Sequence, residues 1–229
     1  MILKLFVPAV VIATFSLASA LTAASPIGRL DSRSQLDAIL GTASVTENFE
    51  AFEVPTNNEL GYFNFFGPLT SNSVIQGQGP GLVVSGISIR TNSQLQWYNT
   101  AALGGNSKRL GFTSGQAYLI DFSTPVSAFG FDFTAVPTTS GSSSMYVYDT
   151  KGDTVGQFQY ALVNNPLVPT FAGFSHPDGI SGVEIFTFQG GPILDNFTFG
   201  RVPEPSALIL ATVGSVIVLS SRRRKSLSD

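Results

Sequence analysis

The sequence predicts an all-β body, an antiparallel β-sandwich or jelly roll, flanked by an N-terminal signal peptide and a C-terminal single transmembrane helix. Two observations predict the body: apolar residues alternate with a period of two, and Gly, Pro, Asn and Ser separate the short apolar segments. A third predicts the flanks, because the longest apolar runs of the 229-residue chain lie at its two ends, beside basic residues.

The alternation is clearest at Phe129, Phe131 and Phe133, whose rings are expected on one face of a strand. The same pattern recurs at Phe186 and Phe188, and at Phe197 and Phe199. Further strands are expected at 82–90, 116–123, 144–149, 154–162, 168–174 and 180–188. The one helix expected in the body covers 32–40.

Local chemistry predicts three interruptions between these strands. Gly152, within Asp149–Asp153, can adopt the positive φ of a tight hairpin. Pro125 is expected to break the chain between two strands, and the segment 174–179 is expected to be a turn.

Composition excludes several classes of function. Between Leu21 and Arg201 the chain has seven basic and thirteen acidic residues, a net charge of −6, which argues against nucleic acid as a partner. The absence of cysteine and the single histidine, His176, leave no usual ligand set for zinc and no thiol nucleophile. No Gly-x-Ser-x-Gly motif is present, so no catalytic residue is assigned.

Residues 1–20 have the order of a secretory signal peptide: Lys4, an apolar run over 5–17, and then small residues at Ala18 and Ala20. We expect cleavage after Ala20, with Ala24 as the second candidate, and export through the Sec machinery. A buried N-terminal helix is the alternative.

The C-terminal tail, 202–225, has three parts. The first is a proline-rich box that consists of Val202, Pro203, Glu204 and Pro205. Its prolines hold the backbone extended and accessible to a processing enzyme. The second part, 206–221, is an apolar run that is short for a membrane span of about 20 residues. The third is a basic end, which keeps the tail's terminus cytoplasmic and the body outside. It consists of Arg222, Arg223, Arg224 and Lys225.

This tail resembles the PEP-CTERM sorting signal, whose pattern is a Val-Pro-Glu-Pro box, a short transmembrane segment and an Arg-rich end. The resemblance implies an exported bacterial protein that is anchored transiently in the inner membrane. It also implies that an exosortase-type membrane protease cuts the chain at the box and passes the body to the cell surface or the extracellular matrix. An ordinary C-terminal anchor is the alternative.

The order of aromatic and glycine residues in the body, as in Phe129-Gly130-Phe131 and Leu194-Asp195-Asn196-Phe197, resembles a lectin-like jelly-roll domain. The chain is therefore divided into the signal peptide, a lead-in segment at 21–44, a sandwich domain at 45–201 and the sorting tail.

A structural Ca²⁺ is considered where the first and last strands of such a sandwich would meet. Glu50, Asp195 and Asn196 offer carboxylate and amide oxygens, which are the ligands that Ca²⁺ prefers. Carbohydrate-binding jelly rolls, which the body resembles, often carry calcium in that region. Capping and turn roles for Asp195 and Asn196 are the alternative.

Sugar binding needs aromatic faces beside amides, because a pyranose has an apolar face and a rim of hydroxyls. Trp97 and Tyr98, in Gln94-Leu95-Gln96-Trp97-Tyr98-Asn99, are the residues considered for it. The alternative for Trp97 is an anchor in the core.

These observations predict a non-catalytic surface or matrix protein that binds extracellular polysaccharide. The competing hypotheses are a secreted glycan hydrolase with two facing carboxylates and a purely structural body without a ligand.

Overall fold

The computed structural model describes residues 27–55, 61–99, 107–112, 116–135, 141–162, 169–187 and 192–201. The predicted signal peptide with Ala18 and Ala20, the Val202–Pro205 box, the apolar run at 206–221 and the basic residues Arg222–Lys225 lie outside these ranges. None of the helices within them has the length and hydropathy of a membrane span.

The described chain is mostly β, as predicted. Its elements, in order, are β1 (Gly28–Leu30), α1 (Arg33–Leu40), η1 (Gly41–Ala43), β2 (Ser44–Glu47), β3 (Tyr62–Phe65), β4 (Leu69–Thr70), β5 (Ile87–Thr91), β6 (Leu95–Tyr98), β7 (Arg109–Phe112), β8 (Ala117–Ala135), β9 (Gly141–Asp149), β10 (Thr154–Leu162), β11 (Thr170–Thr187) and β12 (Pro192–Gly200). Every strand pairing among them is antiparallel, which confirms the predicted class of sheet. The more specific jelly-roll topology stays a prediction.

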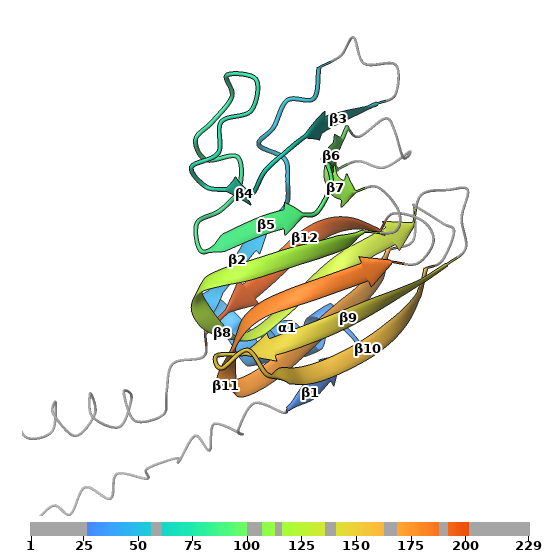
Figure 1. The fold of residues 1–229 in the computed structure, drawn as a ribbon. Coiled ribbons are helices and arrows are strands. Elements are labelled where there is room, and N and C mark those ends of the chain that lie inside the picture. The colour runs from blue at the N-terminus through green and yellow to red at the C-terminus, as the bar shows by residue number, and fades with distance from the viewer. Residues whose placement is uncertain are drawn as a thin grey trace, which may run out of the picture.

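Two long strands, β8 and β11, connect the two layers of the fold (Figure 1). Near Asp121 and Gly182 they pair within the first layer, which continues to β9 and β10 on one side and to β5 and β4 on the other. Near Gly130 and Gly173 they pair within the second layer, which contains β1, β12, β2, β7, β6 and β3. The same two chains therefore contribute to both layers.

The bend between the layers corrects two sequence predictions. Pro125 does not end a strand, and 174–179 is not a turn between strands, because β8 and β11 continue through both segments. The ladder shifts register between Ser175 and Ile180, which carries the chains around the corner without separating them. Gly179 has a φ of 97° there, and a Cβ on it would lie 3.1 Å from Cβ of Pro125.

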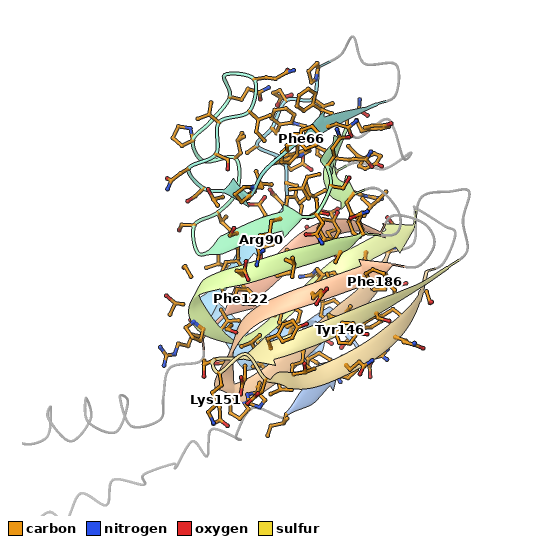
Figure 2. The ribbon with its side chains drawn as sticks, in the orientation of Figure 1. Phe66, Arg90, Phe122, Tyr146, Lys151 and Phe186 are labelled. Atoms are coloured by element: carbon orange, nitrogen blue, oxygen red, sulfur yellow. The ribbon has the colours of Figure 1, made fainter. Side chains whose placement is uncertain are left out.

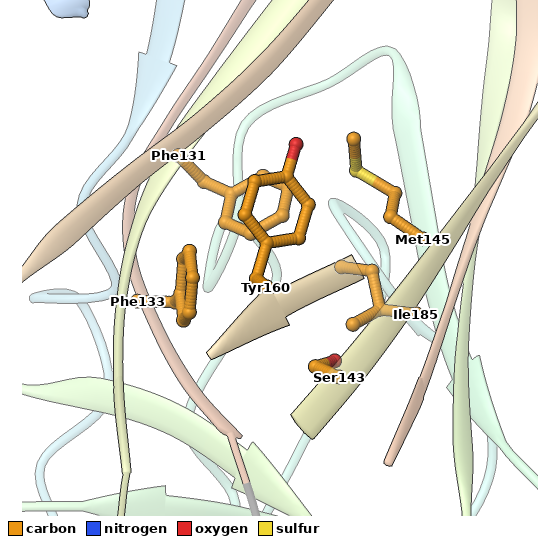
Figure 3. A pocket seen from close by; sticks show the side chains of 6 residues that line it. All are labelled: Phe131, Phe133, Ser143, Met145, Tyr160 and Ile185. Carbon is orange, nitrogen blue, oxygen red and sulfur yellow. The ribbon is translucent and has the colours of Figure 1, made fainter. Parts of the chain in front are cut away.

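Aromatic side chains fill the space between the layers, as the alternation at Phe129, Phe131 and Phe133 predicts. Phe131 stacks on Phe197 with ring centroids 5.8 Å apart, and Phe133 meets Tyr160 of the opposite layer edge to face at 5.4 Å. The lining of a small void there consists of Phe131, Phe133, Ser143, Met145, Tyr160 and Ile185 (Figure 3). The void has a volume of ≈ 10 Å³, which is room for one water and not for a sugar.

The predicted helix is confirmed and covers the second layer from outside. The Ser32 hydroxyl caps α1 by accepting a hydrogen bond from the Gln35 amide, and Gly41 ends it with a φ of 51°. Leu36 and Leu40 pack on the strands beneath the helix. The predicted lead-in segment 21–44 therefore contributes two packed elements, β1 and α1, to the body.

Glu47 is a buried carboxylate, only 3% exposed, that joins β2 to the segment before β5. It accepts hydrogen bonds from the backbone amides of Phe49 and Val84, the second at 2.6 Å. Burial raises the pKa of Glu47 above its ordinary value of 4.5, although these amides oppose the shift.

We expect the free energy of unfolding to reflect this raised pKa. Between pH 4.5 and the folded pKa of Glu47, the folded chain binds more protons than the unfolded one, so stability is lost as the pH rises through this window. Glu47→Gln removes this titration and should make the slope of stability against pH less negative in urea unfolding at a series of pH values. Glu53→Gln, at a largely exposed carboxylate, is the control, and equal slopes for wild type and Glu47→Gln would contradict the prediction.

Candidate functional site

Among the residues that the structure describes, no helix packs on the outward side of the first layer, which we call the open face. We define it by the outward side chains of β10, β9, β11, β8 and β5. These are Gln157, Gln159, Tyr146, Tyr148, Glu184, Phe186, Leu119, Asp121, Ser88 and Arg90. Their neighbours along each strand, such as Met145, Val147 and Ile185, are buried in the core. The helix α1 packs on the other layer.

The ladder aligns one row of side chains across all five strands of the open face. Gln157 is paired with Tyr146, Tyr146 with Glu184, Glu184 with Leu119, and Leu119 with Arg90. Four inter-strand spacings of about 4.8 Å make this row about 19 Å long. The row is therefore long enough to contact several units of an extended polymer.

One aromatic residue, Tyr146, lies in this row, and two more, Tyr148 and Phe186, lie two positions along their strands from members of the row. All three residues are half-buried, so part of each is accessible to solvent. Figure 2 shows Tyr146, Phe186 and Arg90 on strands of this layer. Gly182 lies opposite Tyr148 and is buried.

Tyr148 and Glu184 form the strongest polar contact of the open face. The Tyr148 hydroxyl donates a hydrogen bond to Oε2 of Glu184 at 2.7 Å. Burial of the phenol, and then this hydrogen bond, raise the pKa of Tyr148 to about 12. The phenol therefore stays protonated and remains a donor to the carboxylate.

The charges on the open face are unequally compensated. Arg90 binds Asp121, with Nε and Oδ2 3.0 Å apart. Among the residues that the structure describes, no cation lies within 4 Å of Glu184. Glu184 therefore contributes uncompensated negative charge beside two tyrosine rings.

This combination of groups suits a carbohydrate. The rings provide apolar surface for the faces of sugar units, and the amides of Gln157 and Gln159 with the Glu184 carboxylate provide partners for hydroxyls. No group in the row requires a metal or a cofactor to act in this way.

The structure places Trp97 in the core, which is the alternative of the sequence analysis. Trp97 is 0% exposed, and its indole N–H donates to the carbonyl of Phe49 at 2.8 Å. A buried ring has no face for a sugar, so the ligand role of Trp97 is corrected. Tyr98 is 7% exposed and donates from its hydroxyl to Gln96 at 2.7 Å.

The three residues considered for calcium do not converge on one point. Oε1 of Glu50 accepts a hydrogen bond from the Lys108 amide at 2.8 Å. Asp195 instead contacts the neighbours of Lys108 in the chain, namely the Ser107 hydroxyl and the Arg109 guanidinium, the latter at 3.6 Å. Segment 107–109 thus lies between the two carboxylates.

Asn196 directs its side chain to a third partner, because its amide donates to Oδ2 of Asp132 at 3.0 Å. Within the described ranges, no three acidic or histidine side chains are grouped to hold a metal ion.

Two carboxylates do lie face to face, as the hydrolase hypothesis requires. Asp132 of β8 is directly opposite Asp195 of β12. Asp132 is bound by Arg33 at 3.0 Å, and Asp195 is 8% exposed beside Arg109. Burial raises the pKa of Asp195, while its hydrogen bond from Ser107 opposes the shift. Both groups are thus held by arginines rather than directed at a cleft.

The sequence analysis did not identify the open face. It placed strands at 144–149 and 154–162 and expected Phe186 to share a face with Phe188, which lies outside the described residues. The period of two was the available signal, since Tyr146 and Tyr148 alternate with the more apolar Met145 and Val147. That alternation does not reveal which strands lie beside one another.

No family model matches the chain, and no curated protein does. Among solved structures, a family 6 carbohydrate-binding module has 17% identity and a TM-score of 0.34, over 60% of this chain and 95% of that one. The K2 cleaved adhesin domain of Lys-gingipain has 12% identity and a TM-score of 0.38, over 69% and 100%.

A third similar structure is the CBM22-1–GH10 modules of xylanase 10B from Clostridium thermocellum, complexed with xylohexaose. It has 13% identity and a TM-score of 0.38, over 70% of this chain and 28% of that one. At such TM-scores the likenesses carry no argument about function.

We expect calcium removal to leave the fold unchanged. Glu50 and Asp195 already bind Lys108 and Arg109, so a chelator such as EGTA should shift Tm by less than about 1 °C, measured by circular dichroism. A clear rise in Tm on adding calcium, reversed by EGTA, would contradict this and support the predicted calcium site.

Proposed function

We propose that the protein is an exported, non-catalytic polysaccharide-binding component of the cell surface or extracellular matrix, and that it binds glycans on the open face. The observation that carries the proposal is the row from Gln157 to Arg90, which contains Tyr146 and is bordered by Tyr148 and Phe186 on the layer on which α1 does not pack. Flat rings with amides and a carboxylate between them match the two chemical surfaces of a sugar.

The export part of the proposal rests on the chain ends. The order of charge, apolar run and small residues at 1–20 supports secretion, and the Val202–Pro205 box followed by 206–221 and Arg222–Lys225 supports recognition by an exosortase-type protease. A polysaccharide-binding body then meets its ligand outside the cell.

Replacement of one ring tests the binding site. We expect Tyr146→Ala to weaken binding of the full-length chain to soluble polysaccharides by about fivefold, since one aromatic contact contributes about 1 kcal/mol. Affinity electrophoresis against a panel of polysaccharides provides the measurement.

The control is Tyr62→Ala, at a half-buried tyrosine of β3 that packs on Tyr98 away from the open face. Binding that is lost in Tyr62→Ala and kept in Tyr146→Ala would overturn the assignment of the face. If the wild type releases reducing ends from a polysaccharide, and both Asp132→Asn and Asp195→Asn lose this activity, the protein is a hydrolase instead.

Processing is tested separately by mass spectrometry of the protein recovered from its native host. We expect a mature chain that begins at Leu21 and ends near the box at 202–205. An intact tail on the surface-exposed protein would overturn exosortase processing and leave glycan binding unaffected.

A further inference from the structure

Glu184 has an unusual setting on the open face. It is half-buried, it lies directly opposite Tyr146 across the ladder, and its one hydrogen-bonding partner among the described side chains is the Tyr148 hydroxyl. That partner is neutral, so it satisfies one oxygen of the carboxylate without neutralising its charge.

The cations of the body do not compensate for it. Five of the body's seven basic residues, Arg29, Arg33, Arg90, Lys108 and Arg109, each have another carboxylate partner within 4 Å, and no cation among the described residues forms an ion pair with Glu184. Arg90 lies in the same row as Glu184, but Leu119 separates the two and Asp121 holds the guanidinium. The charge of Glu184 is thus left available to a ligand.

A carboxylate between tyrosine rings is complementary to an ammonium group. The carboxylate supplies an ion pair, and the faces of Tyr146 and Tyr148 attract a cation through their π-electrons. An anionic sugar would instead face Glu184 and a body whose net charge is −6 between Leu21 and Arg201.

We infer that the open face selects glycans that carry ammonium groups, namely chains of hexosamine units with free amines, over uncharged and anionic glycans. The inference rests on the proposed function, because it names the class of glycan that the same site binds. Glu184 is the main determinant of the selection, and the rings add a smaller attraction for ammonium to the contact that all glycans share.

The experiment compares three probes on the full-length chain by isothermal titration calorimetry at low salt. The probes are a hexamer of glucosamine, a hexamer of N-acetylglucosamine and an oligomer of a uronic acid. We expect the protonated glucosamine hexamer to bind about tenfold more tightly than its uncharged counterpart, and the uronic acid to bind most weakly. High salt should reduce the preference.

Glu184→Gln keeps the shape of the side chain and an acceptor for Tyr148 while removing the charge. We expect it to lower the ratio between the two hexamers severalfold, to the smaller preference that the rings supply, without weakening binding of the uncharged hexamer. Asp37→Asn, on the exposed side of α1, changes the net charge equally and should keep the tenfold ratio.

The outcomes separate the inference from the proposed function. Equal binding of both hexamers by the wild type, or an unchanged ratio in Glu184→Gln, would overturn the ammonium selection while glycan binding stands. Preference for the uronic acid would also overturn it. Absence of binding to any glycan, with circular dichroism showing a folded chain, would overturn both.

Discussion

The pairing of β8 with β11 is the constraint on which the rest of the fold depends. These strands pair in both layers, so their bend determines how the layers face one another and which side chains meet between them. The aromatic core follows from it, because Phe131 and Phe133 of one layer contact Tyr160 and Met145 of the other only when the chain turns between Pro125 and Gly130. A register shift near Gly179 accommodates the turn.

The difference between the two outer surfaces follows from what packs on each. On the second layer, Gly130 lacks a side chain, and a Cβ there would lie 2.5 Å from the Phe171 ring and 3.0 Å from Leu36. Because Gly130 has no side chain, α1 packs closely on the sheet and its apolar side is buried. Among the described residues no helix packs on the first layer, so Tyr146, Tyr148 and Phe186 remain partly accessible to water. The surface proposed to bind glycans is thus the one on which α1 does not pack.

Sequence reasoning was most successful where the cause is local. The α1 cap at Ser32, the strand at 154–162 and the hairpin with Gly152, whose φ is 85°, depend on neighbours in the chain. The prediction at Pro125 was wrong. The local propensity of proline would end a strand there, but the tertiary pairing of β8 with its neighbours keeps that strand continuous. Sequence reasoning also could not find the site, because Gln157, Tyr146 and Glu184 become neighbours only through the order of the strands.

The fold places Glu184 in a different environment from the other acidic side chains of the body. Most acidic groups either bind a cation or lie in water, where their charge is well solvated, as Asp37 and Asp178 do. Glu184 is partly removed from water by the rings beside it, and a half-desolvated charge gains more from a bound counter-ion than a solvated one does. Because Asp121 binds Arg90, Glu184 has no cation partner among the described residues, and in our proposal the ligand supplies it. The inferred selection for ammonium groups is therefore a consequence of which ion pairs the sheet forms within itself.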